Sequence, residues 1–116
     1  MRVPDLHDAR AGLWAWRAVR TVRAQLRAGA VRNVRVPDPP RVRPRAARAV
    51  RIVLAREEPS CLERALVLQR WLLSQGIRKD VVIGTSGGMR KAFTAHAWID
   101  GEPLPAPYVE MTRLHP

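Results

Sequence analysis

The stretch SCLERALVLQRWLLSQG, residues 60–76, decides the fold of this chain. Ser60 and Glu63 have the spacing of a capping box, in which the two side chains bond each other's backbone N–H groups at a helix start. Gly76 is expected to end the helix. The segment has a broad apolar stripe, which predicts a helix that is buried on several sides. The stripe is formed by Leu62, Ala65, Leu66, Leu72 and Leu73 and is widened by Val67, Leu68 and Trp71.

The chain has a single cysteine, Cys61, and the capping box places it in the first turn of this helix. Unpaired backbone N–H groups and the helix dipole favour a thiolate at such a position. The same N–H groups are suited to stabilise an oxyanion when sulfur attacks a carbonyl. A lone cysteine is also often only a small buried apolar residue, so catalysis requires a partner base.

His96 is the candidate base. It lies in Thr94-Ala95-His96-Ala97-Trp98, which reads as a strand. A histidine within reach of the thiol takes its proton and returns it to the leaving amine. A histidine between alanines can equally be a core residue. Trp98 is expected to share a sheet face with His96, either shielding the pair or packing in the core.

Helices are expected before this central segment. Apolar residues at spacings of three and four predict a helix over 8–28, begun by Asp8 and ended by Gly29. The prolines of residues 31–44 indicate a linker or an extended crossing. A second helix is expected from Pro44 to the Glu57-Glu58-Pro59 segment.

Strands are expected after the central helix, at 81–85 and 92–99. Asp100-Gly101 reads as a hairpin turn, and a third strand, irregular or at an edge, follows from Leu104. The whole pattern predicts an α+β fold. A basic helical region and proline-rich linker form residues 1–44, and a second domain with the Cys61 helix packed on a small antiparallel sheet forms residues 45–116.

The formal charge of +11 is confined to the first half of the chain. Residues 1–56 carry fourteen arginines against three aspartates, whereas residues 57–116 carry seven basic and seven acidic residues. Such an excess attracts nucleic acid, an anionic membrane surface or an acidic peptide. Coding bias and arginine stems that coat helices explain it as readily.

Other function classes are disfavoured. No apolar run approaches the roughly 20 residues of a membrane span, and the first residues do not resemble a secretory signal. One cysteine cannot form an internal disulfide, which fits a reducing, cytoplasmic setting. His7, Cys61, His96 and His115 lack the spacing of metal ligands, so neither a metal nor a cofactor is expected.

Several blocks resemble the leader peptidases of lasso peptide biosynthesis, which belong to the transglutaminase-like branch of the papain-like cysteine enzymes. The blocks are SCLERAL (60–66), Leu72-Leu73, Gly76-Ile77, Val82-Ile83-Gly84 and FTAHAW (93–98). The resemblance covers roughly residues 45–106. It implies a transglutaminase-like peptidase core in which Cys61 is the nucleophile and His96 the general base.

The resemblance also implies partners. These peptidases remove the leader from a ribosomally made lasso precursor peptide, which a separate leader-recognition protein presents, and a lasso cyclase then closes the ring. The basic first half is a candidate docking surface for an acidic leader or for the recognition protein.

The chain departs from the family at the third catalytic position, where Ala106 replaces the expected acid. Asp100 and Glu110 are the nearby alternatives; Asp100 lies about 13 Å from His96 along the strand, and Glu110 needs a bulge or a long reach. The third member normally fixes the imidazole tautomer. Without this acid, three alternatives are open: another group orients the His96 imidazole, Cys61 and His96 work as a dyad, or the activity is impaired.

Three other functions stay open at this point. The same thioester captured by an amine would make the protein an acyl transferase. Because Ala106 replaces the expected acid, the protein could instead be a catalytically inactive partner of another protein. The arginine excess allows a basic peptide-binding or nucleic-acid-binding module, although no nucleic-acid motif or aromatic platform is present.

Overall fold

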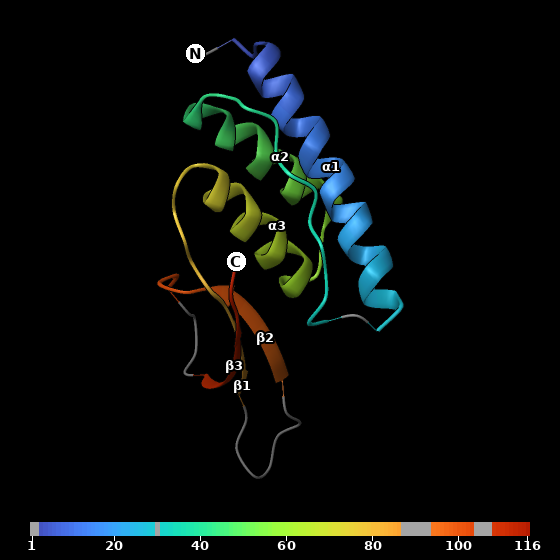
Figure 1. Ribbon diagram of the computed structural model, residues 1–116, viewed down its shortest axis with the longest axis vertical. Coiled ribbons are helices and arrows are strands. Elements are labelled where there is room, and N and C mark those ends of the chain that lie inside the picture. Colours follow the sequence, from blue (N-terminus) through green and yellow to red (C-terminus); the bar gives the residue numbers. More distant parts are fainter. Residues whose placement is uncertain (1–2, 30, 87–93, 104–107) are drawn as a thin grey trace.

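Three helices pack together, and the third of them lies against one face of a small sheet (Figure 1). The computed structural model describes residues 3–29, 31–86, 94–103 and 108–116. In chain order the elements are three helices followed by three strands, with one short 3₁₀ turn before the second helix. This arrangement confirms the predicted α+β fold.

Helix α1 spans Leu6–Arg27, two residues earlier than its apolar pattern indicates. Asp5, not Asp8, is the N-cap: its carboxylate accepts from the Asp8 N–H, and the Asp8 carboxylate accepts from the Asp5 N–H at 2.9 Å. Asp8 therefore lies inside the helix as the second half of the capping box. Gly29 follows the end of α1 with φ of 85°, as expected of a helix-terminating glycine.

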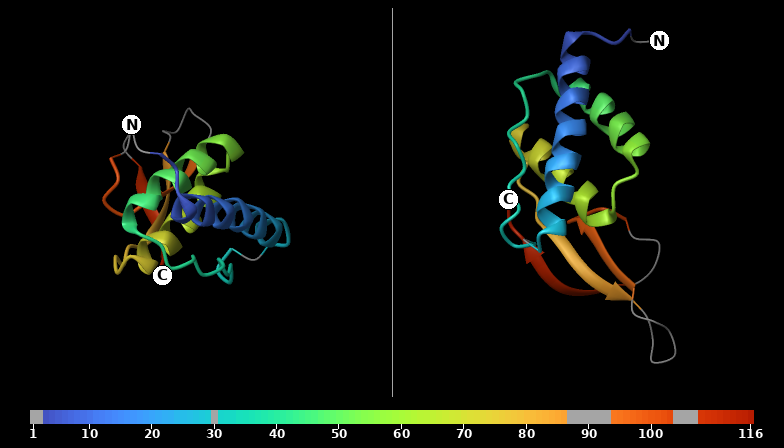
Figure 2. Two further views of the ribbon diagram at one scale, coloured as in Figure 1. Left: turned by 90° about the horizontal axis from the view of Figure 1, so that it is seen from above. Right: turned by 90° about the vertical axis from the view of Figure 1, so that its right-hand side faces the viewer.

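The proline-rich segment 31–43 is an extended crossing that runs beside α1 (Figures 1 and 2). The Trp14 indole donates to the Pro37 carbonyl at 2.9 Å. The Gln25 amide accepts from the Arg35 N–H and donates to the Arg35 carbonyl, both at 2.8 Å. These bonds fix the crossing against the helix despite its missing backbone donors.

Pro44 begins a 3₁₀ turn, Pro44–Ala46 (η1), that leads directly into α2, Ala47–Glu57. Val50 and Leu54 are buried on its inner face. Glu58 ends it in the left-handed conformation with φ of 48°. Both predicted boundaries of this helix are confirmed.

Helix α3 spans Cys61–Ser74 and has the predicted capping box. The Ser60 hydroxyl accepts from the Glu63 N–H at 3.2 Å, and the Glu63 carboxylate accepts from the Ser60 N–H at 3.0 Å. Gly76, with φ of 81°, ends the helix, and the next N–H returns to the Leu72 carbonyl. The central element thus begins and ends where local sequence signals place it.

The sheet contains β1 (Val81–Ser86), β2 (Thr94–Ile99) and β3 (Val109–Leu114), all antiparallel, in the order β2-β1-β3. Gly101 has φ of 93°, and the Glu102 N–H bonds the Ile99 carbonyl, so the Asp100-Gly101 turn exists. The hairpin prediction is wrong, because β2 and β3 do not pair. The third strand begins at Val109, and residues 104–107 lie outside the described part, as do Ala92 and Phe93.

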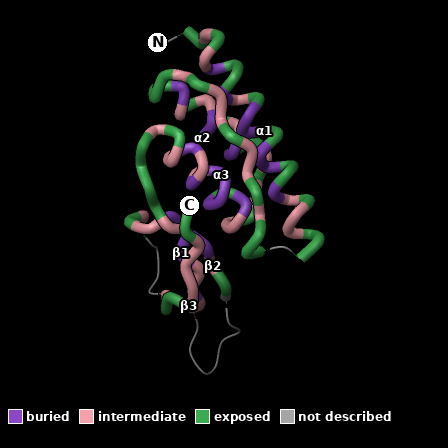
Figure 3. The backbone as a smooth tube through the Cα atoms, viewed as in Figure 1, coloured by how far each residue is buried: buried purple, intermediate pink, exposed green. Residues whose placement is uncertain are grey.

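The core lies between the helices and one sheet face (Figure 3). It includes Ala15, Val19 and Val22 of α1 together with residues of α2, α3 and the sheet. Residues of the segment 1–44 thus belong to the same hydrophobic core as residues 45–116. The domain boundary at residue 44 stays a prediction. No helix in the described ranges is long and apolar enough to cross a membrane.

One buried side chain ties the central helix to the sheet. The Gln69 amide donates to the Lys79 carbonyl before β1 at 3.0 Å and to the Leu114 carbonyl at the end of β3 at 2.8 Å. Gln69 is only 6% exposed, so these bonds satisfy a donor group that has little access to water.

Candidate active site

Cys61 is the first residue of α3, and its side chain is partly buried against the edge of the core. Within the described chain, the backbone N–H groups of Cys61 and Leu62 have no hydrogen-bond acceptor. The sulfur therefore lies beside two free donors at the positive end of a helix. This arrangement suits a nucleophile whose reaction develops negative charge on an oxygen.

Arg23 of α1 supports this helix start. Its guanidinium bonds the Glu63 carboxylate through Nε and Nη2, each 3.2 Å from Oε1, and approaches the Glu57 carbonyl at 3.5 Å. Glu63 is 8% exposed, so its charge is compensated by Arg23 and by the Ser60 N–H rather than by water. Neither the charge distribution nor the helical pattern of α1 indicated this contact, which joins residues forty positions apart.

His96 lies on β2 within an aromatic cluster. Its ring centroid is 5.1 Å from that of Tyr108 and 5.9 Å from that of Trp98, with the Trp98 ring inclined by only 19°. Trp98 thus shares the face of His96, as its spacing predicts. Ala97 and Ile99, which alternate with them, belong to the core beneath the helices.

Cys61 and His96 are therefore held by different parts of the fold. Strand alternation places the His96 side chain on the sheet face opposite the helix-packed residues. Cys61 and His96 make no hydrogen bond with each other. The structure does not assemble the two candidate residues into a bonded pair, and their catalytic roles stay predictions.

Gly84 makes room for the aromatic cluster. It pairs with His96 on one side and with Glu110 on the other. A Cβ at this position would lie 2.7 Å from the Trp98 Cη2 atom and 2.6 Å from the Val109 carbonyl oxygen. The missing side chain lets the indole lie across the middle strand beside His96.

The two alternative acids are both bound by Arg113. Its guanidinium donates to Glu110 at 2.8 Å through Nε and to Asp100 at 3.0 Å. The hydrogen bonds from Arg113 hold the pKa of Glu110 below its ordinary value. Neither carboxylate bonds His96, and Ala106 lies outside the described residues.

Glu102 is an acid near His96 that sequence reasoning missed. Burial raises its pKa, but hydrogen bonds from Arg64 and the Ile99 N–H, with the charges of Arg64 and His96, lower the pKa by more. The Arg64 Nη2 donates to its carboxylate at 3.1 Å. Its position in the Asp100-Gly101-Glu102 turn was a usable signal, because the turn returns the chain toward the end of β2.

A cavity of about 720 Å³ adjoins the helix segment that bears Cys61. It lies between α2, α3 and the end of β2, and reaches from Pro59 to the Arg64–Glu102 pair. Arg64 is three residues after Cys61, hence on a neighbouring part of the same helix face. The apolar wall consists of Leu54, Leu68, Trp71, Leu72 and Ile99. Neither Cys61 nor His96 lines this cavity, but Pro59 and Arg64 on either side of Cys61 in the sequence do, and its apolar wall can take apolar side chains.

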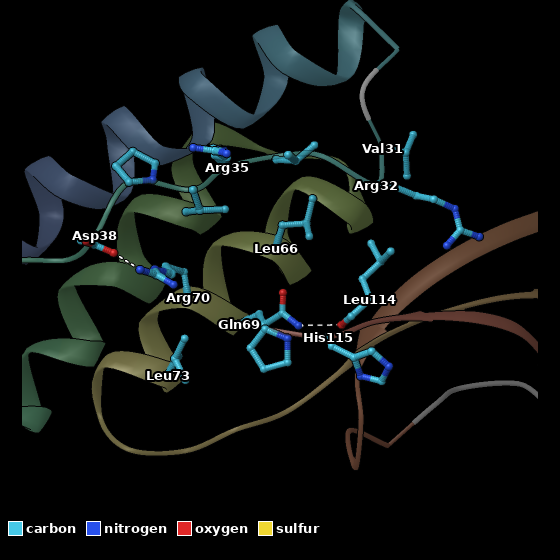
Figure 4. A pocket seen from close by; sticks show the side chains of 14 residues that line it. Val31, Arg32, Arg35, Asp38, Leu66, Gln69, Arg70, Leu73, Leu114 and His115 are labelled. Atoms are coloured by element: carbon cyan, nitrogen blue, oxygen red, sulfur yellow. Dashed lines mark hydrogen bonds and ion pairs between the residues drawn. The ribbon is translucent and has the colours of Figure 1, made fainter.

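A separate cavity of about 490 Å³ lies between the crossing segment, α3 and the C-terminal residues (Figure 4). Its lining includes the Asp38–Arg70 ion pair and the bond from Gln69 to the Leu114 carbonyl. Neither Cys61 nor His96 lines it. In the described ranges, no three His, Cys, Asp or Glu side chains are grouped as a metal site requires.

Cys61 at the start of the central helix and His96 on an antiparallel strand follow one another in the order expected of a cysteine-based enzyme. The family model of the transglutaminase-like superfamily matches residues 7–113 of this chain. The chain therefore belongs to the transglutaminase-like superfamily, whose members are commonly cysteine peptidases or acyl transferases. Comparisons with curated proteins and with solved structures gave no match.

Proposed function

We propose that this protein is a cysteine peptidase that removes the leader from a lasso precursor peptide in the cytoplasm, acting with a leader-recognition protein and a lasso cyclase. The observation that carries the proposal is the position of Cys61, partly exposed in the first turn of a capped helix beside two free N–H donors. The superfamily supports the reaction class, and the resemblance of the blocks around Cys61 and His96 to lasso leader peptidases supports the substrate class.

The proposed reaction has two steps. The Cys61 thiolate attacks the carbonyl carbon at the end of the leader, and the resulting oxyanion is bound by the N–H groups of Cys61 and Leu62. The C–N bond then breaks, the imidazolium of His96 gives its proton to the leaving amine, and a thioester remains. Water attacks the thioester and gives one proton to His96. The C–S bond then breaks, the leader carboxylate leaves with its second proton lost to solvent, and the Cys61 thiolate and His96 imidazolium are restored.

His96 must change its contacts for this reaction. The imidazole packs on Tyr108 and Trp98 and has no bond to Cys61. In the described sheet, β2 pairs only with β1, so one edge of the histidine strand is unpaired. We expect that binding of the precursor or of the recognition protein brings the His96 imidazole and the Cys61 thiol together. The isolated protein should therefore cleave slowly.

The cavity beside Pro59 and Arg64 is the proposed site for apolar substrate side chains. The part of its apolar wall that belongs to α3 is Leu68, Trp71 and Leu72, which lie about two to three turns after Cys61 along the helix. Side chains bound there would hold the scissile carbonyl near the sulfur and contribute orientation to catalysis.

The test is leader release, followed by mass spectrometry, in a mixture of the protein, the precursor and the recognition protein. Cys61→Ala and His96→Ala should each abolish release. His115→Ala is the matched control, because His115 is an exposed histidine bonded to Asp80. Full release by Cys61→Ala would overturn the proposal.

Acyl transfer is the second candidate, because it proceeds through the same thioester. Adding a primary amine to the same mixture separates the two reactions. A leader that ends in a free carboxylate indicates hydrolysis, whereas a leader joined to the amine indicates transfer.

A further inference from the structure

A second surface with a defined chemistry lies on α1, outside the candidate active site. A groove of about 550 Å³ runs between this helix and residues 37–40. Its floor and walls come from Leu13 and Trp14 of the helix and from Pro37 and Pro40 of the crossing. Because the indole of Trp14 bonds the Pro37 carbonyl, the two walls are fixed relative to each other.

Three arginines line the groove: Arg10, Arg17 and Arg20. Their spacing of seven and three residues places them along one face of α1. All three are exposed, and none has a carboxylate partner within the described residues. The one acid in the lining, Asp38, is already paired with Arg70.

The groove also offers apolar surface between these charges. Leu13 lines the groove and is 48% exposed, whereas Val19 and Val22 of the same helix are fully buried in the core. The prolines add apolar walls without backbone donors. A ligand that satisfies this surface carries negative charge together with an aliphatic group.

We infer that this groove binds an acidic peptide segment that carries an aliphatic side chain. The carboxylates pair with the three arginines, and the aliphatic group covers Leu13. A single-stranded nucleic acid fits less well, because it gains affinity by stacking its bases on aromatic rings, and the rings of this surface are largely covered. Trp14 is buried, and one face of Trp16 is covered by the Arg20 guanidinium, 4.4 Å from the ring centroid.

The groove leads toward the candidate active site. Arg20 is three residues before Arg23, a rise of about 4.5 Å along the helix axis. Arg23 bonds Glu63 in the first turn of the Cys61 helix. A peptide that extends along α1 beyond Arg20 would therefore approach the first turn of the Cys61 helix. Here the inference rests on the proposed function, since the natural peptide would then be the leader.

The test measures binding directly, in a Cys61→Ala background, so that catalysis plays no part. The probe is a short fluorescein-labelled peptide of glutamates interrupted by leucines, followed by anisotropy. Combining Arg10→Glu, Arg17→Glu and Arg20→Glu should weaken binding by roughly tenfold or more, as expected for three lost ion pairs. Leu13→Ser should also weaken it while leaving its salt dependence unchanged.

The matched control combines Arg48→Glu, Arg56→Glu and Arg78→Glu, three exposed arginines outside the groove. It makes the same change in net charge and should alter the affinity much less. If both triple variants lost the same amount of affinity for the peptide, the effect would come from overall charge alone, and the inference would be overturned. Tighter binding of a single-stranded oligonucleotide of equal charge would overturn it as well.

Leader release in the active protein separates this inference from the proposed function. Peptide binding without any cleavage would reject the peptidase and leave the groove as a peptide site. Undiminished cleavage in the groove triple variant would reject the groove as the leader site and leave the peptidase in place.

Discussion

The guanidinium of Arg23 bonds the carboxylate of Glu63, which in turn accepts the Ser60 N–H at the start of the Cys61 helix. One side chain of the basic helix α1 therefore completes the capping box of α3. The arginine excess of the first half is consequently not all solvated surface, because this member fixes the segment that carries the thiol.

Arg23→Met should lower the free energy of unfolding by about 2 kcal/mol. The substitution keeps the apolar stem but leaves the nearly buried Glu63 carboxylate without its cationic partner. Urea denaturation at neutral pH measures the effect. Arg48→Met, at an exposed site, should change stability by no more than about 0.5 kcal/mol, and an equal effect of the two would contradict the assigned role.

Ser60→Ala should cost about 1 kcal/mol of stability, the usual effect of losing a side-chain cap. It should also slow alkylation of Cys61 by iodoacetamide, because the first turn of α3 loses the bond that holds it. Ser60→Asn restores a capping side chain and should recover most of both properties. Alkylation that is unaffected in Ser60→Ala would disconnect the cap from the thiol.

Gly84→Ala should destabilise the protein by about 1–3 kcal/mol, because the new methyl group overlaps the Trp98 ring and the Val109 carbonyl. Near-ultraviolet circular dichroism should report the displaced indole. Gly12→Ala is the opposite case: its Cβ meets only Val53 at 3.5 Å. Since alanine favours a helix interior, Gly12→Ala should stabilise by up to about 1 kcal/mol.

The Arg113 cluster should make stability fall in acid. A hydrogen bond from His115, then those from Arg113, lower the pKa of Asp80, and Arg113 lowers that of Glu110. Lowered pKa values in the folded state favour folding while the groups are ionised, above about pH 4, and this contribution disappears as pH falls through them.

Arg113→Met tests this dependence. Its urea midpoint should be lower than that of the unchanged protein at neutral pH, and the two midpoints should converge at about pH 2, where the carboxylates are protonated. A difference that persists in acid would mean that Arg113 acts through packing alone.

Local signals predicted the central helix well. Ser60, Glu63 and Gly76 act within one or two turns of themselves, so their roles follow from spacing. At the start of α1 the local signal is ambiguous: Asp5 and Asp8 have capping-box spacing and either resembles an N-cap, so the sequence pattern favours Asp8 while the structure has Asp5 as the cap.

Contacts between distant segments were less predictable. The Asp100-Gly101 turn has the backbone of a hairpin turn, but β1 takes both β2 and β3 as partners, so the chain passes on to the far edge of the sheet. Arg23 and Glu102 reach their partners across about forty residues, at separations where sequence spacing carries no geometric information. The sequence places Cys61 on a helix and His96 on a strand, as the structure has them, but alternation along β2 determines which way the His96 side chain points.

The link between the central helix and β3 depends on the Gln69 side chain being an amide. Both of its donor bonds end on carbonyl oxygens, at Lys79 and Leu114. Deamidation would replace the two N–H donors with a carboxylate oxygen, which would face both carbonyls with like partial charge and little water. A single hydrolysed amide would thereby release β3 from the central helix while the sequence elsewhere stayed intact.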